Sequence, residues 1–118
     1  MHNKIEKGLH GQLAAERYLS ARGFRILERN YRLRSGEIDL IAQDNGFVVF
    51  IEVKYRNNLQ FGYPRESVTA YKQHHIRKTA LHYIQKHPND ECDYRFDVVE
   101  VLDLDGKREI THIENAFN

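Results

Sequence analysis

The sequence contains only one cysteine, Cys92, which excludes an internal disulfide and a cysteine-based zinc site. It has no apolar run long enough to span a bilayer, and its first residues lack the hydrophobic core of a signal peptide. These absences predict a protein of the reducing cytoplasm with no membrane contact. A repeat, a glycine-rich phosphate loop and a paired nucleophile and base are also missing, so neither a P-loop nucleotide site nor a nucleophilic triad is predicted.

The composition is that of an ordinary globular domain, and charge of neither sign predominates. The 118 residues are 41% hydrophobic and 30% charged, and the formal net charge is only +1. A chain of this length is expected to form one domain, 1–118, with a core of two or three layers. The overall charge does not indicate a polyanionic partner, so the distribution of charge along the chain has to be examined instead.

The stretch from Gly36 to Tyr55 consists of two apolar, β-branched runs separated by Asn45-Gly46. Asn-Gly between such runs is a strong hairpin signal, because a type I′ turn needs φ > 0 at both central residues. With these residues in the turn, the register puts four charged side chains on one face in two opposed pairs, Asp39 with Glu52 and Glu37 with Lys54. The other face is wholly apolar, with Ile38, Leu40 and Ala42 facing Val49, Ile51 and Val53.

Two interpretations of the charged face are open. It could be the solvated face of an amphipathic hairpin, in which the charges form ordinary cross-strand ion pairs. Three apolar residues share this face, however, which indicates that another element covers it: Ile41, Val48 and Phe50. The opposed carboxylates of Asp39 and Glu52 also repel each other and need a compensating cation. We favour the second interpretation, in which the hairpin is half of a divalent-metal site.

A helical period is present near the N-terminus, over residues 3–22. The pattern puts five residues on one stripe, which are Ile5, Leu9, Gln12, Glu16 and Leu19, with Leu13 and Ala15 beside it. Gly23 follows at the position where a C′ glycine ends a helix. A carboxylate on the inner stripe needs a partner, so Glu16 either reaches solvent at the edge of the stripe or points at a site.

A second helix is predicted to begin at Thr69 or Ser67 and to end near His87, before Pro88. Its apolar face consists of Ile76, Ala80, Tyr83 and Ile84, and this stripe is extended toward the sheet by Lys72 and Gln73. Four histidines lie on or next to this helix, but none has a partner at i+4, so solvent exposure is expected rather than zinc binding for His74, His75, His82 and His87.

Three further stretches alternate as strands, at 24–34, 92–102 and 108–114, and the turn signal Asp105-Gly106 joins the last two. The first carries the one clear basic run, which consists of Arg22, Arg25, Arg29, Arg32 and Arg34. This run is either a solvated strand face or a rim that contacts phosphates. Residues 56–68 are predicted as a loop whose aromatic residues, Phe61 and Tyr63, either pack the loop down or contact a substrate.

The resulting order is α-β-β-β-α-β-β, with a helical crossover before the fourth strand. It predicts an α/β fold in which helices flank a mixed sheet. With these elements placed, Asp39 followed after twelve residues by Glu52-x-Lys54 resembles the signature of the restriction-endonuclease-like, PD-(D/E)XK, nucleases, whose core is α-β-β-β-α-β. The proline that often precedes the first aspartate is replaced by Ile38.

The whole chain resembles more closely the YraN family of small bacterial proteins. The matching segments run nearly from end to end and comprise Gly8–Glu16, Asn30–Arg32, Gly36–Ala42, Phe50–Arg56, Phe61-Gly62 and Arg95–Val98. This resemblance implies a restriction-endonuclease-like fold with an extra C-terminal strand. It also implies metal-assisted hydrolysis of phosphodiester bonds.

The resemblance further implies the residues of a site. Mg²⁺ or Mn²⁺ would be bound by Asp39, Glu52 and the carbonyl of Val53, since these hard cations take oxygen ligands. Glu16 matches an acidic residue of the archaeal Holliday-junction-resolvase branch, and would add a ligand directly or through water. Lys54 would orient the attacking water or stabilise charge on the phosphate.

The implied substrate is DNA in preference to RNA, including branched intermediates of recombination or repair, and a homodimer is compatible with this function. The residues expected to contact nucleic acid are Arg22, Arg25, Arg29, Arg32, Arg34, Arg56, Lys72 and Gln73. Two other functions stay open. One is a non-catalytic nucleic-acid-binding module with the same fold, and the other is a protein-interaction domain that docks through the arginine run.

Overall fold

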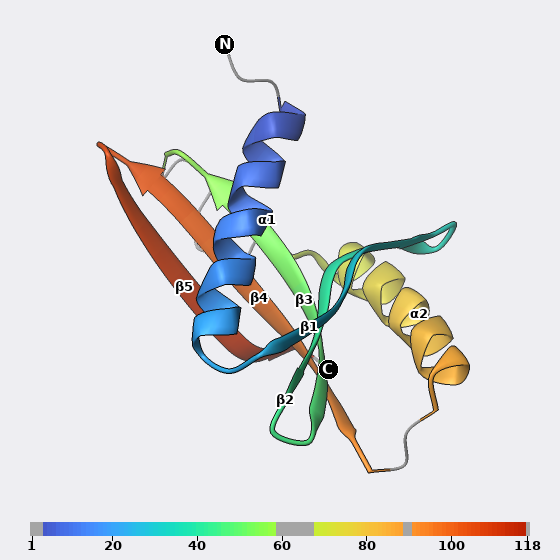
Figure 1. Cartoon of the computed structure of the whole chain (residues 1–118). Helices are drawn as coiled ribbons and strands as arrows, with labels where there is room; N and C mark the ends of the chain where they lie inside the picture. Colours follow the sequence, from blue (N-terminus) through green and yellow to red (C-terminus); the bar gives the residue numbers. More distant parts are fainter. Residues whose placement is uncertain (1–3, 59–67, 89–90, 118) are drawn as a thin grey trace.

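The computed structural model describes residues 4–58, 68–88 and 91–117. Along the chain the elements are α1 (Lys4–Ala21), β1 (Arg25–Leu33), β2 (Gly36–Asp44), β3 (Phe47–Arg56), α2 (Ala70–Lys86), β4 (Asp93–Leu104) and β5 (Lys107–Phe117). The strands form one sheet in the order β1-β2-β3-β4-β5, in which β3 and β4 are parallel and all other neighbours are antiparallel. The predicted α/β fold with a mixed sheet and an extra C-terminal strand is confirmed (Figure 1).

The register of the β2–β3 hairpin is the one that Asn45-Gly46 predicts. Asp44 pairs with Phe47 and Leu40 with Ile51, and both turn residues have positive φ, 43° at Asn45 and 83° at Gly46. Regular pairing ends at Leu40 and Ile51. Beyond this point the hairpin carries its charged residues, so the site is built where the ladder stops.

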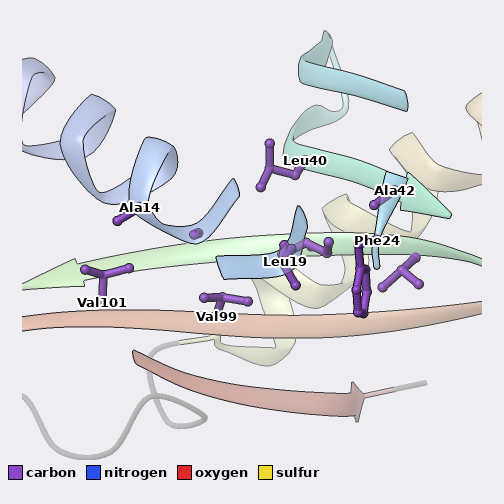
Figure 2. Close-up of a cluster of buried hydrophobic side chains, with 10 residues drawn as sticks. Ala14, Leu19, Phe24, Leu40, Ala42, Val99 and Val101 are labelled. Carbon is purple, nitrogen blue, oxygen red and sulfur yellow. The ribbon is translucent and has the colours of Figure 1, made fainter. Parts of the chain in front are cut away.

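Helix α1 packs on one face of the sheet, over β3 and β4, and forms the hydrophobic cluster shown in Figure 2. The predicted stripe on this helix is wrong at Leu9, which is 57% exposed. It is also wrong at Leu13, which is 46% exposed, whereas Ala15 and Leu19 are buried as predicted. Gly11, which was not predicted, completes the contact. A Cβ at Gly11 would lie 2.8 Å from Cβ of Tyr55, so glycine permits α1 to approach β3 closely. A count of large apolar side chains cannot detect such a seam.

Helix α2 covers the opposite face of the sheet, which is the face predicted to be charged (Figure 1). Phe50 and Ile41 pack there against Ile76, Ala80 and Tyr83 of the helix, so the expectation of a covered face is confirmed. Strand alternation predicts Ile38 on the other face with Leu40, but Ile38 packs in this α2 cluster. Strict alternation fails at Ile38 because β2 has left its ladder with β3 there.

The N-terminal end of α2 is fixed by Thr69, whose hydroxyl accepts a hydrogen bond from the backbone N–H of Lys72. His74 and His87 are exposed as expected, whereas His75 and His82 are half-buried and hydrogen-bonded to Ser35 and Tyr31. The prediction that all four histidines face solvent is therefore wrong for these two.

Smaller differences concern the ends of elements. β5 runs to Phe117, three residues beyond its predicted end, and Arg56 belongs to β3 rather than to the following loop. The predicted loop aromatics Phe61 and Tyr63 lie outside the described residues. Neither described helix combines the length and the apolar character needed to cross a membrane.

Candidate active site

A cavity of about 730 Å³ opens between the β1–β2 turn, the ends of β2 and β3, and the first two turns of α2. Its wall brings together three residues of the predicted signature, Asp39, Glu52 and Lys54. Lys72 from α2 and Arg34 from the β1–β2 turn line the same cavity. Glu37 is also part of the wall, so the tertiary structure collects three carboxylates and three cationic side chains around one space.

Asp39 is held at the point where β2 and β3 separate. Its Oδ2 accepts a hydrogen bond of 2.8 Å from the backbone N–H of Val53, which fixes the carboxyl group between the strands. Burial and the nearby charge of Glu52 raise the pKa of Asp39 from 3.8 to about 7, although the Val53 bond and Lys72 act in the opposite direction. The positive charge near this carboxyl group is therefore too small to offset its burial and the repulsion from Glu52.

Glu52 is buried, and two ammonium groups reach its carboxylate. Nζ of Lys72 lies 2.6 Å from Oε1 of Glu52, and Nζ of Lys54 lies 3.5 Å from the same oxygen. Burial lowers the pKa of Lys54, and the neighbouring Lys72 lowers it further. Burial also opposes the charge of Lys72, but attraction to Glu52 outweighs it and raises the pKa of this lysine. Lys72 thus neutralises the carboxylate.

The donor set of this cavity suits a hard divalent cation. Asp39 and Glu52 supply carboxylate oxygens on the wall of this cavity, and Val53, whose N–H is bonded to Asp39, follows Glu52 directly on β3. The Lys72 ammonium already takes a cation's place beside Glu52. Within the described residues, no group of three or more histidine, cysteine or acidic side chains is assembled to bind a metal. Carbonyl, amide or water oxygens would therefore have to complete the coordination of an ion.

Glu16 is placed away from this cavity. Its carboxylate forms a two-pronged ion pair with Arg29 on β1, with Nε of Arg29 at 2.9 and 3.0 Å from the two carboxylate oxygens. Three other residues of α1, Gly8, Leu9 and Gln12, line a second cavity of about 310 Å³ to which Asp39 also contributes. Of these three, Gln12 carries a polar side chain, so the polar group that α1 brings to the cavity of Asp39 is an amide and not the Glu16 carboxylate.

Three other residues named from the sequence form different contacts from those predicted. Glu37 pairs with Arg32, at 3.2 Å, rather than with Lys54. Gln73 donates from Nε2 to the carbonyl of Val68, at 2.9 Å. Arg56 is half-buried with its Nε 2.6 Å from Oε2 of Glu100, so this guanidinium is already paired with a carboxylate.

The structure divides the basic run of β1 into two groups. Arg34 lines the main cavity, and Arg32 pairs with Glu37 at its edge. Arg25 lies near the opposite end of β1, facing Gln43, and Arg22 covers the ring of Tyr18 on α1. Along β1, Arg25 and Arg34 are separated by about 30 Å. Only the first group is close enough to act with the carboxylates on one ligand.

Two residues of the cavity wall, Tyr71 and His75, were missed by the sequence analysis. The ring of His75 donates from Nδ1 to the carbonyl of Ser35, at 2.8 Å, because a carbonyl oxygen can only accept. The ring of Tyr71 lies 4.4 Å from it, centroid to centroid. Tyr71 and His75 are spaced i, i+4 on the helix, so they lie side by side on α2. This spacing could have predicted that both line the site, since the neighbouring Lys72 was already predicted to point toward the sheet.

Comparison with known proteins assigns the chain to a family. Residues 11–101 match the model described as "Uncharacterised protein family UPF0102". The chain belongs to the UPF0102 family. It is 43% identical to a UPF0102 protein of Caldicellulosiruptor saccharolyticus over 98% of this chain and 99% of that protein. It is also 47% identical to the Lachnoclostridium phytofermentans protein over 100% of this chain and 97% of that one, and 48% identical to the Clostridioides difficile protein over 99% and 100%.

The raised pKa of Asp39 predicts how the stability of this UPF0102 protein depends on pH. The unfolded chain releases the Asp39 proton near pH 3.8, whereas the folded chain keeps it to about pH 7. Between these values the unfolded state binds fewer protons, so this contribution to stability is complete below about pH 4 and is lost as the pH rises to about 7. Urea unfolding should therefore show that the free energy of unfolding decreases more from pH 5 to pH 8 in wild type than in Asp39→Asn. Equal losses in the two proteins would contradict the shift.

Proposed function

We propose that this UPF0102 protein is a metal-dependent nuclease that hydrolyses phosphodiester bonds in DNA. The observation that carries the proposal is the grouping of Asp39, Glu52 and Lys54 in one cavity with Lys72 bonded to Glu52. A buried carboxylate, Glu52, next to a half-buried one of like charge, Asp39, is costly to a fold that does not use them. A cationic rim beside them suits a polyanionic substrate.

Asp39, Glu52 and the carbonyl of Val53 would hold Mg²⁺ or Mn²⁺, which is the assignment that the donor chemistry favours. Such an ion, when bound, places positive charge next to the phosphoryl oxygens and lowers the pKa of a water molecule bound to it. Lys72, whose ammonium is paired with Glu52, would lie beside the carboxylate that holds the ion and would offer its charge to the phosphate. Lys54, with its lowered pKa, orients the attacking water or stabilises the charge that develops on the phosphate.

The first turn of α2 supports the binding of an anion in the same place. Thr69, Tyr71 and Lys72 all line the cavity, so the N-terminal end of the helix opens onto it. Backbone N–H groups and the helix dipole favour negative charge at such an end, and no acidic residue occupies the first turn of α2. A phosphate next to Lys54 would therefore be stabilised by the helix as well as by side chains.

A cleavage screen tests the proposal. Labelled four-way junctions, flaps, single strands and duplexes of DNA are incubated with the protein in Mg²⁺, in Mn²⁺ or in EDTA. The proposal requires cleavage of at least one substrate with metal and none in EDTA. Salt-dependent DNA binding without cleavage would assign the chain to a nucleic-acid-binding module. Absence of both would leave protein interaction as the function.

The division of the basic run leads to a separate prediction about DNA affinity. The double change of Arg32 and Arg34 to alanine should weaken binding about equally across sequences and reduce the salt slope by roughly one per lost phosphate contact. The matched control changes Arg22 and Arg25 to alanine, which removes the same charge at the far end of β1. Binding isotherms at several salt concentrations measure both. Equal losses in the two double variants would show that only net charge matters.

A further inference from the structure

Tyr71 is an exposed aromatic side chain at the mouth of the candidate active site. It is 77% exposed, more than any other large hydrophobic side chain in the described part of the chain. It stands in the first turn of α2 and lines the same cavity as Asp39 and Glu52. A large ring left in solvent contributes little to the core, so its position beside the carboxylates calls for a ligand.

The ring of Tyr71 is supported from within the protein. His75, one turn further along α2, lies at 4.4 Å between ring centroids and at an angle of 60° to it. The imidazole of His75 is fixed in turn by its hydrogen bond to the carbonyl of Ser35 in the β1–β2 turn. Tyr71 therefore has one neighbour that limits its movement and a large open surface on which another flat group can stack.

The chemistry of the surrounding wall identifies that flat group. Lys54, Lys72 and Arg34 line the cavity with Tyr71, so three cationic side chains lie beside an aromatic ring, on a wall that also holds the carboxylates. Positive charge that follows a phosphate backbone, combined with aromatic rings that stack on bases, is the combination that binds single-stranded nucleic acid. A duplex could not use the ring, because stacking with neighbouring base pairs already covers the faces of its bases.

The size of the cavity agrees with this assignment. Its volume of about 730 Å³ is in the range that holds one small ligand. A nucleotide whose phosphate reaches Asp39 and Glu52 has to place its sugar and base within this space, and Tyr71 is part of the wall.

We propose that Tyr71, supported by His75, stacks on an unpaired base next to the phosphate that is cleaved. The substrate is then a nucleic acid with a single-stranded segment at the cleavage position, such as a flap, a frayed end or a free single strand. This inference rests on the proposed nuclease function and narrows its substrate class. It predicts that pairing of the nucleotides at the cleavage position lowers affinity.

The test measures binding in EDTA, so that it does not depend on cleavage. Single-stranded DNA that carries one 2-aminopurine reports stacking through quenching of its fluorescence, and a duplex of the same length serves as the paired ligand. The proteins are wild type, Tyr71→Ala, Tyr71→Phe and Leu81→Ala. Leu81 is an exposed apolar residue of the same helix outside this cavity, so its replacement is the matched control.

Tyr71→Ala is expected to weaken single-strand binding by about 5- to 150-fold and to abolish the quenching. Binding of the duplex should not change, and Tyr71→Phe and Leu81→Ala should bind single strands like wild type. Melting temperatures confirm that all four proteins are folded. Unchanged single-strand affinity in Tyr71→Ala, or an equal loss for single strand and duplex, overturns the inference and leaves the nuclease proposal intact. Failure of wild type to bind single-stranded DNA also overturns the inference, whereas the nuclease proposal is judged by the cleavage screen in Mg²⁺ or Mn²⁺.

Discussion

Replacing Asp39 with asparagine is expected to abolish cleavage and the rise in melting temperature that Mg²⁺ or Mn²⁺ produces in wild type. The change removes a proposed metal ligand and, at the same time, the repulsion between Asp39 and Glu52. In wild type, metal at 100-fold above Kd should stabilise the fold by about 2.7 kcal/mol, which corresponds to roughly 10 °C in melting temperature. The metal-free variant should be at least as stable as wild type at pH 8, because asparagine needs no proton.

This combination of effects separates a metal ligand from a structural carboxylate. A carboxylate that only supports the fold would lower the metal-free melting temperature when it is replaced. Glu109→Gln provides the control, since Glu109 is an exposed residue of β5 and does not line the cavity. Melting curves with and without metal, beside the cleavage assay, measure both. Wild type with no metal shift and no cleavage on any substrate would falsify the nuclease assignment.

The second large effect is expected from the two lysines that contact Glu52. Lys72→Met should increase metal affinity by about 10- to 100-fold, because a charge-assisted hydrogen bond to Glu52 no longer competes with the ion. Lys54→Met should increase it less, since this ammonium is farther from the carboxylate, at 3.5 Å. Both variants should lose at least about 100-fold in cleavage rate, because each removes a cation that stabilises the reacting phosphate.

Opposite changes in metal affinity and cleavage rate are what identify these lysines as partners of the phosphate. Lys86→Met, in the last turn of α2, changes the same charge at the other end of the helix and should alter neither quantity. Calorimetric titration with Mn²⁺ gives the affinity, and single-turnover cleavage gives the rate. If metal affinity in Lys72→Met equals that of wild type, the ammonium does not occupy the position of the ion.

The sequence by itself determined the register of the central hairpin. Only a type I′ turn satisfies positive φ at Asn45 and Gly46, and the alternation of a strand then sets which residues share a face. This one turn is enough to predict that Asp39, Glu52 and Lys54 lie together. Local chemistry also predicted Thr69 as the cap of α2, because a hydroxyl at this position accepts a hydrogen bond from a backbone N–H of the first turn.

Other features were decided by tertiary contacts. Gly11, Ala15 and Leu19 of α1 face the sheet, whereas Leu9 and Leu13 are exposed. The close helix–sheet approach requires a residue without a side chain at Gly11, and hydrophobic periodicity gives glycine no weight. The separation of β2 from β3 moved Ile38 to the other face and gave the Val53 N–H to Asp39. The packing of α1 placed Gln12 on the wall of the small cavity that Asp39 also lines, and it paired Glu16 with Arg29.

The residues of the candidate site also divide into those placed by local sequence and those placed by tertiary contacts. The two carboxylates and Lys54 lie on adjacent strands joined by a two-residue turn, so local geometry is enough to assemble them. Lys72, Tyr71 and Arg34 are distant in sequence, and they meet the carboxylates only because α2 and the β1–β2 turn pack against the same end of the sheet. The sequence therefore determined the proposed metal ligands, whereas the surfaces proposed to bind the substrate depend on packing between elements, which local patterns do not encode.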